Sequence, residues 1–514
     1  MKKFFALFFS LCLAAGLLAG CGGSGGEKAV SMKKMTVGDT TFNPENAEPN
    51  VNPHESYAGW ACIRYGIGET LIRYSDKMEV EPWLAKSFEN IDPLTWKLTL
   101  RDGVKFHSGR AMDAAAVKEC LEALAKNHDR APKDLMIDSI EADGQTLTIK
   151  TKEPRPALLN YLGDPYACIV DVKAGVKDGI VAGTGPYIAV ECKSGDHLTL
   201  KKNANYWNGT PKLDELTIKT ISNGGTLSAA LQSGEIDAAY GMAYESYPLF
   251  QNDKFHFSQV ATSRAFFLWM NYRSPIVSDP AVRKAIAMGV NKEGFVKTLL
   301  HGNGYSAQGV FPAGFAFGGD KTKTESYDPE GAKKVLEAAG WIDTDGDGIR
   351  EKDGKKLTVR WLTYPSRLEL PLLAESAQAE LKKIGIDVEV NSTASHNKLR
   401  KDSAAWDVYV SAMVTAPTGD PEYFFASCCL DSSPVNNGHF HSDKLEALAK
   451  ELSVEFDPAK RAQLAVDMQQ AILDDNGYVF CSFLQMSLIS KKNVVGYNAH
   501  PCDYYQITAE TDKK

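Results

Sequence analysis

The stretch LDELTIKTISNGGTLSAALQSGEIDAAYG, residues 213–241, decides the fold class. Leu213–Ile221 is predicted to form a strand, Thr226–Gln232 a helix, and Asp237–Gly241 a short apolar strand. Such a strand–helix–strand unit is the building block of α/β proteins. The stretch therefore predicts an α/β fold.

The same alternation of strands and helices continues on both sides of this unit. Further strands are predicted at Met35–Thr41, Trp96–Leu100, Phe266–Met270, Leu357–Thr363, Asp387–Val390, Trp406–Met413 and Val479–Ile489, with a hairpin at Ser139–Thr151. Helices are predicted at Tyr57–Tyr74, Ala114–Ala125, Asp279–Val290, Asp328–Gly340, Glu369–Ile384, Leu445–Leu452 and Pro458–Asp474. Two α/β blocks with a ligand crevice between them are a common architecture for this pattern.

Composition limits the classes of function. The chain has 514 residues, 44% of them hydrophobic, and a formal net charge of −8. This length is sufficient for two or more lobes with separate cores. An acidic surface without basic clusters argues against a nucleic-acid partner.

The amino terminus has the parts of an export signal. Lys2 and Lys3 form a short positive region, Phe4–Leu18 is apolar, and two small residues precede Cys21. The segment ending at Cys21 resembles the lipobox of bacterial lipoproteins, and Gly22–Gly26 is typical of a flexible tether. The protein is therefore expected to be lipid-anchored outside the cytoplasmic membrane. The alternative is a plain secretory peptide with a chance cysteine.

Eight cysteines remain after Cys12 and Cys21 are assigned to the signal and the lipid site: Cys62, Cys120, Cys168, Cys192, Cys428, Cys429, Cys481 and Cys502. Their spacings match neither a Cys-x-x-Cys redox motif nor a zinc finger. An even number in an exported protein permits disulfides. Scattered buried thiols and one or two disulfides both remain open.

Catalytic signatures are absent from the sequence. The one Gly-x-Ser-x-Gly lies at Gly22–Gly26, where no strand-to-helix elbow holds the serine. There is no His-Glu-x-x-His and no Gly-x-x-x-x-Gly-Lys. Pro186, in the Gly-rich run that begins at Gly183, lacks the N–H that a phosphate would need. The protein is not expected to be an enzyme.

Two motifs are suited to metal binding. Asp343–Gly348 resembles the first half of a calcium loop, but Gly354 stands where the bidentate carboxylate belongs, so an acidic surface turn is favoured. His439 and His441 share one face if the chain between them is extended, and both imidazoles then reach one metal while Phe440 packs inward. The alternative is a loop anchored by Phe440 with solvated histidines.

Aromatic and basic side chains offer candidate ligand contacts. Tyr57, Trp60, Arg64 and Tyr65 form one cluster that is suited to stacking on a ligand or binding its carboxylates, or else to ordinary packing. Arg130, Arg264 and Arg367 are further cations near the ends of predicted elements. Taken singly, each is more typical of a surface residue.

Several runs, in order along the chain, resemble the extracytoplasmic solute-binding proteins of peptide and nickel ABC importers, known as family 5. The most specific are Glu81–Phe88 and Thr95–Gly109. Shorter ones are Gly183–Tyr187, Asn205–Gly209, Ser233–Asp237, Trp269–Asn271, Val282–Ile286 and Tyr327–Pro329.

The resemblance implies a two-lobed α/β clamshell of the periplasmic-binding-protein type II, with an extra subdomain in lobe I. Its domains are a signal peptide (1–20), a tether (21–33), lobe I (34–267 with 485–514, subdomain about 77–180) and lobe II (268–484). It also implies a non-enzymatic monomer that closes on a solute and delivers it to an ABC permease.

The choice of solute depends on fewer residues. Peptide binders of the family usually hold the peptide amino terminus with an aspartate just before a Pro-Asp-Pro-like run. Here Asp420 matches the second aspartate, but Pro417 or Thr418 stands at the anchor position, and a buried ammonium without a carboxylate is costly. Ala416-Pro417 resembles the nickel and metallophore branch instead. A nickel chelate is therefore the favoured cargo and an oligopeptide or dipeptide the alternative.

The nickel branch implies a ligand site of arginines, aromatic rings and a histidine. The residues implied here are Tyr57, Arg64, Tyr65, Arg130, Trp269 and Arg367, with His439 or His441 on the metal. No second carboxylate-binding arginine is found where one is expected, because Asp164–Ala167 occupy that place. Nickel would be part of the cargo and no resident cofactor is expected. A secreted hydrolase and a surface sensor or adhesin are the rivals from other classes.

Overall fold

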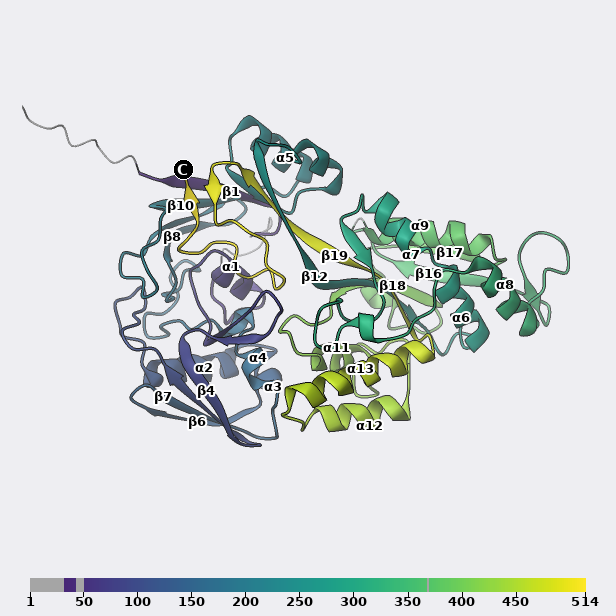
Figure 1. Ribbon diagram of the computed structural model, residues 1–514, viewed down its shortest axis with the longest axis horizontal. Coiled ribbons are helices and arrows are strands. Elements are labelled where there is room, and N and C mark those ends of the chain that lie inside the picture. The colour runs from purple at the N-terminus through teal and green to yellow at the C-terminus, as the bar shows by residue number, and fades with distance from the viewer. Residues whose placement is uncertain (1–31, 43–49, 368) are drawn as a thin grey trace, which may run out of the picture. The chain divides into compact units, whose positions relative to one another are not determined.

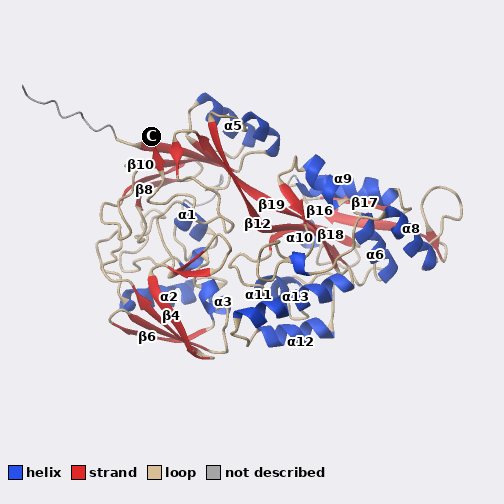
Figure 2. Cartoon of the chain, viewed as in Figure 1, coloured by secondary structure: helices blue, strands red, loops and turns tan. Residues whose placement is uncertain are grey.

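The computed structural model describes residues 32–42, 50–367 and 369–514. The predicted signal peptide, Cys21 and the glycine tether lie outside these residues. Within the described ranges, no helix has both the length and the apolar character that a membrane span requires. Figures 1 and 2 show how helices and strands are arranged along the chain.

Eleven strands form one mixed sheet. They are β1 (Lys34–Asp39), β8 (Tyr187–Lys193), β9 (His197–Lys202), β10 (Glu215–Thr220), β11 (Ala238–Tyr240), β12 (Phe255–Met270), β13 (Gly304–Ser306), β16 (Thr358–Thr363), β17 (Asp387–Ser392), β18 (Val408–Val414) and β19 (Tyr478–Lys491). Their order is β17-β16-β18-β12-β19-β11-β1-β10-β9-β8, and β13 pairs with β19.

The strand–helix–strand unit predicted at residues 213–241 is confirmed. It comprises β10, helix α5 (Gly224–Ser233) and β11, and α5 begins at Asn223, whose side chain accepts a hydrogen bond from the N–H of Thr226. Both strands pair in parallel with β1. Because parallel strands end at the same edge, Asp39, Thr220 and Tyr240 lie side by side at the carboxyl ends of β1, β10 and β11.

A second, antiparallel sheet has the order β4-β5-β7-β6. Its strands are β4 (Ala85–Asp92), β5 (Thr95–Leu100), β6 (Ile137–Asp143) and β7 (Thr146–Thr151). Helix α2 (Ala114–Asn127) packs on this sheet through its apolar stripe, which includes Val117, Leu121 and Leu124, all buried. The predicted strand, helix and hairpin of this region are confirmed.

The other helices and short strands complete the chain. The helices are α1 (Ala58–Arg64), α3 (Ala131–Leu135), α4 (Leu158–Tyr161), η1 (Pro165–Ala167), η2 (Tyr244–Leu249), α6 (Pro280–Gly289), α7 (Lys292–Gly294), η3 (Phe295–Leu299), η4 (Gly319–Lys321), α8 (Pro329–Ala338), α9 (Glu369–Lys382), α10 (His396–Leu399), α11 (Glu422–Cys428), α12 (Asp443–Leu452) and α13 (Pro458–Asp474). The short strands are β2 (Ile72–Tyr74), β3 (Val80–Pro82), β14 (Glu351–Lys352), β15 (Lys355–Lys356), β20 (Val494–Val495) and β21 (Asp512–Lys513).

The helix predicted over Tyr57–Tyr74 is wrong beyond Arg64. The chain turns at Gly66, whose φ of +68° lies in the left-handed region that favours glycine. The last residues of the predicted helix form strand β2 instead. By contrast, the predicted cap of α6 is confirmed, since the Asp279 carboxylate accepts a hydrogen bond from the N–H of Ala281.

Two large hydrophobic cores are joined by β12 and β19. We call the cluster drawn from residues 35–218, 238 and 486–507 the first core, and the cluster drawn from residues 265–483 the second core. The two strands lie side by side and antiparallel, and their register shifts between Ala261 and Ala265. The first half of β12 is partly exposed. The strand predicted from the sequence, Phe266–Met270, covers only its apolar last part.

All eight cysteines of the described chain are free thiols. Seven are buried and Cys192 is partly exposed. Of the two alternatives left open by the sequence, the structure therefore has scattered buried thiols.

Candidate functional site

The two cores meet through polar contacts between segments that are far apart in sequence. Arg155 Nη1 lies 2.8 Å from Glu422 Oε1, and Asn160 Nδ2 donates to the Thr418 carbonyl at 2.8 Å. The Tyr504 hydroxyl donates to the Pro417 carbonyl at 3.1 Å. The charged and aromatic side chains gathered around these contacts are called the inter-core site. They are Trp60, Arg64, Arg130, Asp134, Asp164, Tyr240, Arg264, Arg367, Tyr423, Asp503 and Tyr504.

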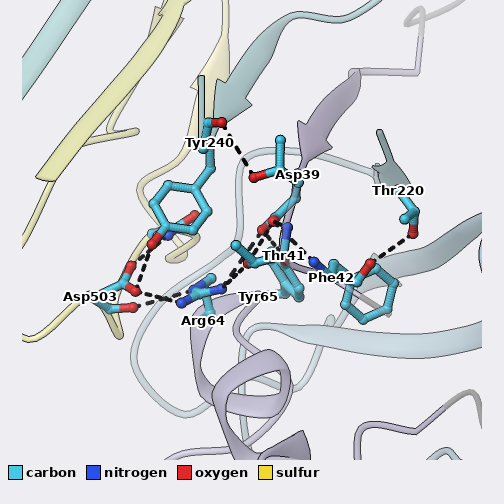
Figure 3. Close-up of polar contacts among 11 residues, drawn as sticks. Asp39, Thr41, Phe42, Arg64, Tyr65, Thr220, Tyr240 and Asp503 are labelled. Atoms are coloured by element: carbon cyan, nitrogen blue, oxygen red, sulfur yellow. Dashed lines mark hydrogen bonds and ion pairs between the residues drawn. The ribbon is translucent and has the colours of Figure 1, made fainter. Parts of the chain in front are cut away.

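The carboxyl end of β1 supplies a fully buried carboxylate to this site. Asp39 accepts hydrogen bonds from the backbone N–H groups of Thr41, at 2.5 Å, and Phe42, at 3.1 Å. It also accepts from the Thr41 hydroxyl and from the phenol of Tyr65 (Figure 3). The ring of Tyr65 packs edge-on against Phe42 at 5.5 Å. Tyr65, predicted to contact the ligand, therefore holds the strand end in place.

Arg64 is bonded on all sides by the protein. Its Nη2 lies 2.5 Å from Asp503 Oδ2, its Nη1 donates to Thr41 at 3.1 Å, and its guanidinium lies 4.8 Å from the ring centre of Tyr240. Tyr240 also donates to Asp503, at 2.9 Å (Figure 3). Burial opposes the charge of Arg64, but Asp503, Tyr240 and Asp39 outweigh it, so its pKa lies well above the ordinary value. Arg64 is thus a supporting residue with its donors already used.

Arg264 and Arg367 are different. Neither guanidinium forms a hydrogen bond or an ion pair with any residue in the described ranges. Burial lowers the pKa of Arg264, and the charge of Arg367 lowers it further. Arg264 lies at the register shift of β12, where a bulge re-aims side chains. Two neighbouring cations whose donors are not used by an ion pair form a natural site for an anion.

The neighbours of this arginine pair come from both sides of the contact region. Tyr240, Asp503 and Glu369 lie close enough to Arg264 to oppose the lowering of its pKa. Glu369 is buried and accepts a hydrogen bond from the phenol of Tyr244. The pair is therefore set in a polar, largely desolvated surrounding where its charges act strongly.

Arg130 is held by two carboxylates. Its Nη2 lies 3.0 Å from Asp164 and 3.4 Å from Asp134, and its guanidinium lies 5.2 Å from the ring centre of Tyr166. Asp164 caps helix η1 and accepts from the N–H of Tyr166. Burial opposes the charge of Arg130, but the two carboxylates raise its pKa above the ordinary value. The predicted carboxylate-binding arginine is already compensated.

Aromatic side chains lie beside both Arg64 and Arg130. Trp60 lies edge-on to Tyr504 at 5.0 Å and has the guanidinium of Arg64 5.7 Å from its ring centre. Tyr504 lies close enough to Asp164 and Arg130 for both to affect its pKa, which burial raises. Tyr57, at the start of α1, is 72% exposed, so its ring is free to contact a ligand or solvent.

The structure places Trp269 in the second core, away from a ligand-facing position. It is 3% exposed and packs against Phe267 at 5.7 Å, Tyr409 at 5.8 Å and Tyr478 at 6.0 Å. Its position near the end of β12 points it into this stack because alternate residues of a strand face the same side.

His439 and His441 do not share a face in the way the sequence predicts. His439 has a φ of +55°, so the backbone is left-handed there and not extended. Burial and the charge of Arg273 lower the pKa of His439, while Asp431 raises the pKa of the exposed His441. His441 lies 3.0 Å from Asp431 and 3.3 Å from Asp443. Phe440 is buried, as expected.

Asp343, Asp345, Asp347 and Glu351 are the one group of three or more potential metal ligands in the described residues whose ligand atoms all lie within 4.8 Å of one another. The fourth carboxylate comes from Glu351, because the twelfth position of the calcium-like loop is Gly354, which has no side-chain carboxylate. Lys356 already contacts Asp345, at 3.5 Å, and Asp347, which agrees with an acidic surface turn.

Sequence reasoning missed Asp503, Tyr240 and Tyr504. Asp503 is 439 residues from Arg64, and no local motif marks either partner. Arg264 was noted, but no pattern distinguishes a cation without a partner from one with a partner.

Comparisons with known proteins agree on the family. The family model described as bacterial extracellular solute-binding proteins, family 5 Middle, matches residues 79–434. The nickel-binding protein NikA of Staphylococcus aureus is 26% identical over 99% of both chains. The oligopeptide-binding protein AppA of Bacillus subtilis is 28% identical over 85% of this chain and 84% of its own. A crystal structure of a nickel ABC transporter protein from Bacillus halodurans has a TM-score of 0.82, 30% identity, and covers 93% of this chain and 100% of its own.

These likenesses confirm the predicted α/β class and the two-domain fold of periplasmic solute-binding proteins. The match of the family model over most of the chain, together with the solved relative, shows that the chain belongs to the bacterial extracellular solute-binding proteins of family 5.

Proposed function

We propose that this protein captures a nickel chelate outside the cytoplasmic membrane and delivers it to the permease of an ABC importer. The observation that carries the proposal is the pair Arg264 and Arg367, two neighbouring cations whose guanidinium groups form no hydrogen bond or ion pair with a described residue. Carboxylates of a small chelating ligand would supply the missing charge through charge-assisted hydrogen bonds. The nickel-binding relatives support the choice of metal.

The inter-core site would bind this chelate between the two cores. Trp60 and Tyr504 offer aromatic rings in the site, and Tyr57, three residues before Trp60 in the chain, offers an exposed ring. Arg64 would act indirectly, by holding Asp503 and Tyr240 beside Arg264. Neither histidine of the pair is assigned to this site, because Gly438, the residue before His439, accepts from the N–H of Tyr272 beyond the end of β12, six or more residues past Arg264.

The domain arrangement belongs to the same proposal. Residues 34–267 with 485–514 would form lobe I, and residues 268–484 lobe II, in keeping with the two cores and with the two connecting strands. Closure would occur by a hinge in β12 and β19 near the register shift. Cys21 would carry the lipid that keeps the protein beside its permease and raises its effective concentration there.

Calorimetry on the purified protein tests the cargo. Nickel chloride with two equivalents of L-histidine is titrated, beside nickel chloride alone, L-histidine alone and a library of short peptides. We expect saturable binding of the nickel–histidine mixture. Arg264→Gln should weaken this binding about ten- to a hundredfold, because it removes one charged hydrogen bond. Lys254→Gln is the matched control, since it removes an exposed charge just before the start of β12. Tight peptide binding without any response to the nickel mixture would contradict the proposal.

An oligopeptide is the second candidate cargo. The similarity to the oligopeptide-binding protein AppA favours it, and the arginine pair would equally suit a peptide carboxyl terminus. Against it, Pro417 and Thr418 offer no side-chain carboxylate for the ammonium group. Mass spectrometry of the natively purified protein would distinguish a peptide from a nickel complex directly.

A further inference from the structure

We propose that Asp164 makes the inter-core site selective for amino-acid-type chelates without net negative charge, and that it excludes polycarboxylate chelates. This inference rests on the proposed function and names the class of chelating ligand. It follows from how charge is distributed between the two ends of the site.

One end of the site has an excess of negative charge. Arg130 lies 3.0 Å from Asp164 and 3.4 Å from Asp134, so these three side chains carry two carboxylates and one cation. The neighbouring ion pairs do not change this balance. Arg155 with Glu422, at 2.8 Å, and Arg461 with Asp420, at 2.6 Å, each contain one cation and one carboxylate. A further carboxylate brought by a ligand would meet repulsion here.

Asp164 is the residue that fixes this balance. It is 4% exposed and its second carboxylate oxygen accepts from the N–H of Tyr166 at 3.3 Å, so it cannot swing away into solvent. Asp134 is more exposed and lies further from the guanidinium. Tyr423, from the other side of the contact region, is close enough for Arg130, Asp164 and Asp134 all to affect its pKa, which burial raises to about 12. Arg155 joins this group to helix α11, because its Nε donates to the Asp134 carbonyl at 2.8 Å and its Nη1 lies 2.8 Å from Glu422, the residue before Tyr423.

The other end offers cations whose donors are not used. Arg264 and Arg367 form no ion pair among the described residues, although Asp503 and Glu369 lie near Arg264. Trp60 packs edge-on against Tyr504 at 5.0 Å and has the guanidinium of Arg64 5.7 Å from its ring centre. A chelate of a divalent metal with two amino acids is neutral overall. It would place a carboxylate at Arg264 and direct the N–H groups of its metal-bound amino group toward the Arg130–Asp164 pair. A citrate complex has carboxylates on every side and would leave one beside Asp164.

The test compares two nickel complexes on three forms of the protein. Calorimetry measures the dissociation constants for nickel with two equivalents of L-histidine and for nickel with citrate. The forms are the unaltered protein, Asp164→Asn and Asp129→Asn. The last removes the same charge from an exposed residue beside Arg130 in the chain, whose side chain is not one of the two carboxylates paired with Arg130. Asparagine can still accept from Tyr166, and thermal unfolding checks that the variant is folded.

We expect the unaltered protein to prefer the histidine complex. Asp164→Asn should improve citrate-complex binding about tenfold or more, while the histidine complex gains nothing, so the ratio of the two constants changes. Asp129→Asn should leave the ratio unchanged, and Asp164→Glu should restore the original preference. Citrate-complex binding that equals or exceeds histidine-complex binding in the unaltered protein, or a ratio that Asp164→Asn does not move, overturns this inference alone. No binding of either complex overturns the proposed function and this inference with it.

Discussion

Replacing Asp503 by asparagine would show how much the supporting network beneath the site contributes to stability. The change keeps the shape of the side chain and its hydrogen bond from Tyr240, but removes the charge 2.5 Å from Arg64. The side chains of Arg64 and Asp503 are 8% and 17% exposed, so water cannot replace the lost partner. Asp39, at 3.8 Å, is the remaining carboxylate near Arg64 and already accepts four other hydrogen bonds.

Breaking a buried ion pair on one side costs about 3–5 kcal/mol. The compact unit runs from Lys33 to Lys514, and at roughly 2.1 cal/mol/K per residue its unfolding entropy is about 1 kcal/mol/K. Asp503→Asn should therefore lower the melting temperature by about 3–5 °C. Scanning calorimetry without ligand measures this change directly.

Two comparisons make the result decisive. Asp512→Asn removes the same charge from a pair with the more exposed Lys33, and it should cost less than about 1 °C. The double variant Arg64→Met with Asp503→Asn removes both charges of the pair, while Asp39 keeps its four hydrogen bonds. It should be more stable than the two single losses combined by about 2 kcal/mol. A loss below 1 °C for Asp503→Asn, or a double variant whose losses simply add, would refute the reasoning.

Three further measurements test other parts of the structure. His439→Ala and His441→Ala should each change nickel binding less than about twofold, because His439 lies beyond the end of β12 remote from Arg264 and His441 pairs with Asp431 and Asp443. A tenfold loss for either variant would argue for a histidine on the metal. Burial would raise the pKa of Asp237, but two lysines outweigh this effect and lower it. The ionised Asp237 therefore stabilises the fold above the ordinary aspartate pKa of about 3.9, and this stabilisation is lost as pH falls through the lower pKa of the folded state. The melting temperatures of the unaltered protein and Asp237→Asn should differ at pH 6 and converge below about pH 4, and a constant difference would contradict this. Among the eight described cysteines, iodoacetamide at pH 8 should label only Cys192 in the folded protein, and slowly, because burial raises its pKa to about 11. Rapid labelling of several of these thiols would show that the buried ones are accessible.

Sequence patterns were sufficient wherever the deciding interactions are local. The β10–α5–β11 unit was predicted because its apolar spacing and its turn residues lie within one short stretch. The cap of α6 was predicted because an aspartate before a proline satisfies backbone N–H groups two or three residues away. The first half of β12 was not predicted, because its residues lack an apolar alternation and are held in the sheet by pairing with β19.

The candidate site divides in the same way. Residue type identified Arg64, Arg130 and Arg367 as cations suited to carboxylates. The structure shows that Arg64 and Arg130 are already paired with Asp503 and Asp164, while Arg264 has no partner among the described residues. Pairing depends on the distance between side chains that are 34 residues apart in one case and 439 in the other, and no periodicity encodes such distances.

By itself, the amino-acid sequence determined the α/β class, the likeness to family 5 solute-binding proteins and the expectation of a lipid anchor, because each depends on short runs of residues. Only the tertiary structure decided which cations remain free for a ligand, that Trp269 belongs to the second core, and that the two histidines do not share an extended face. These properties depend on desolvation and on contacts between distant segments, which exist only once the chain has folded.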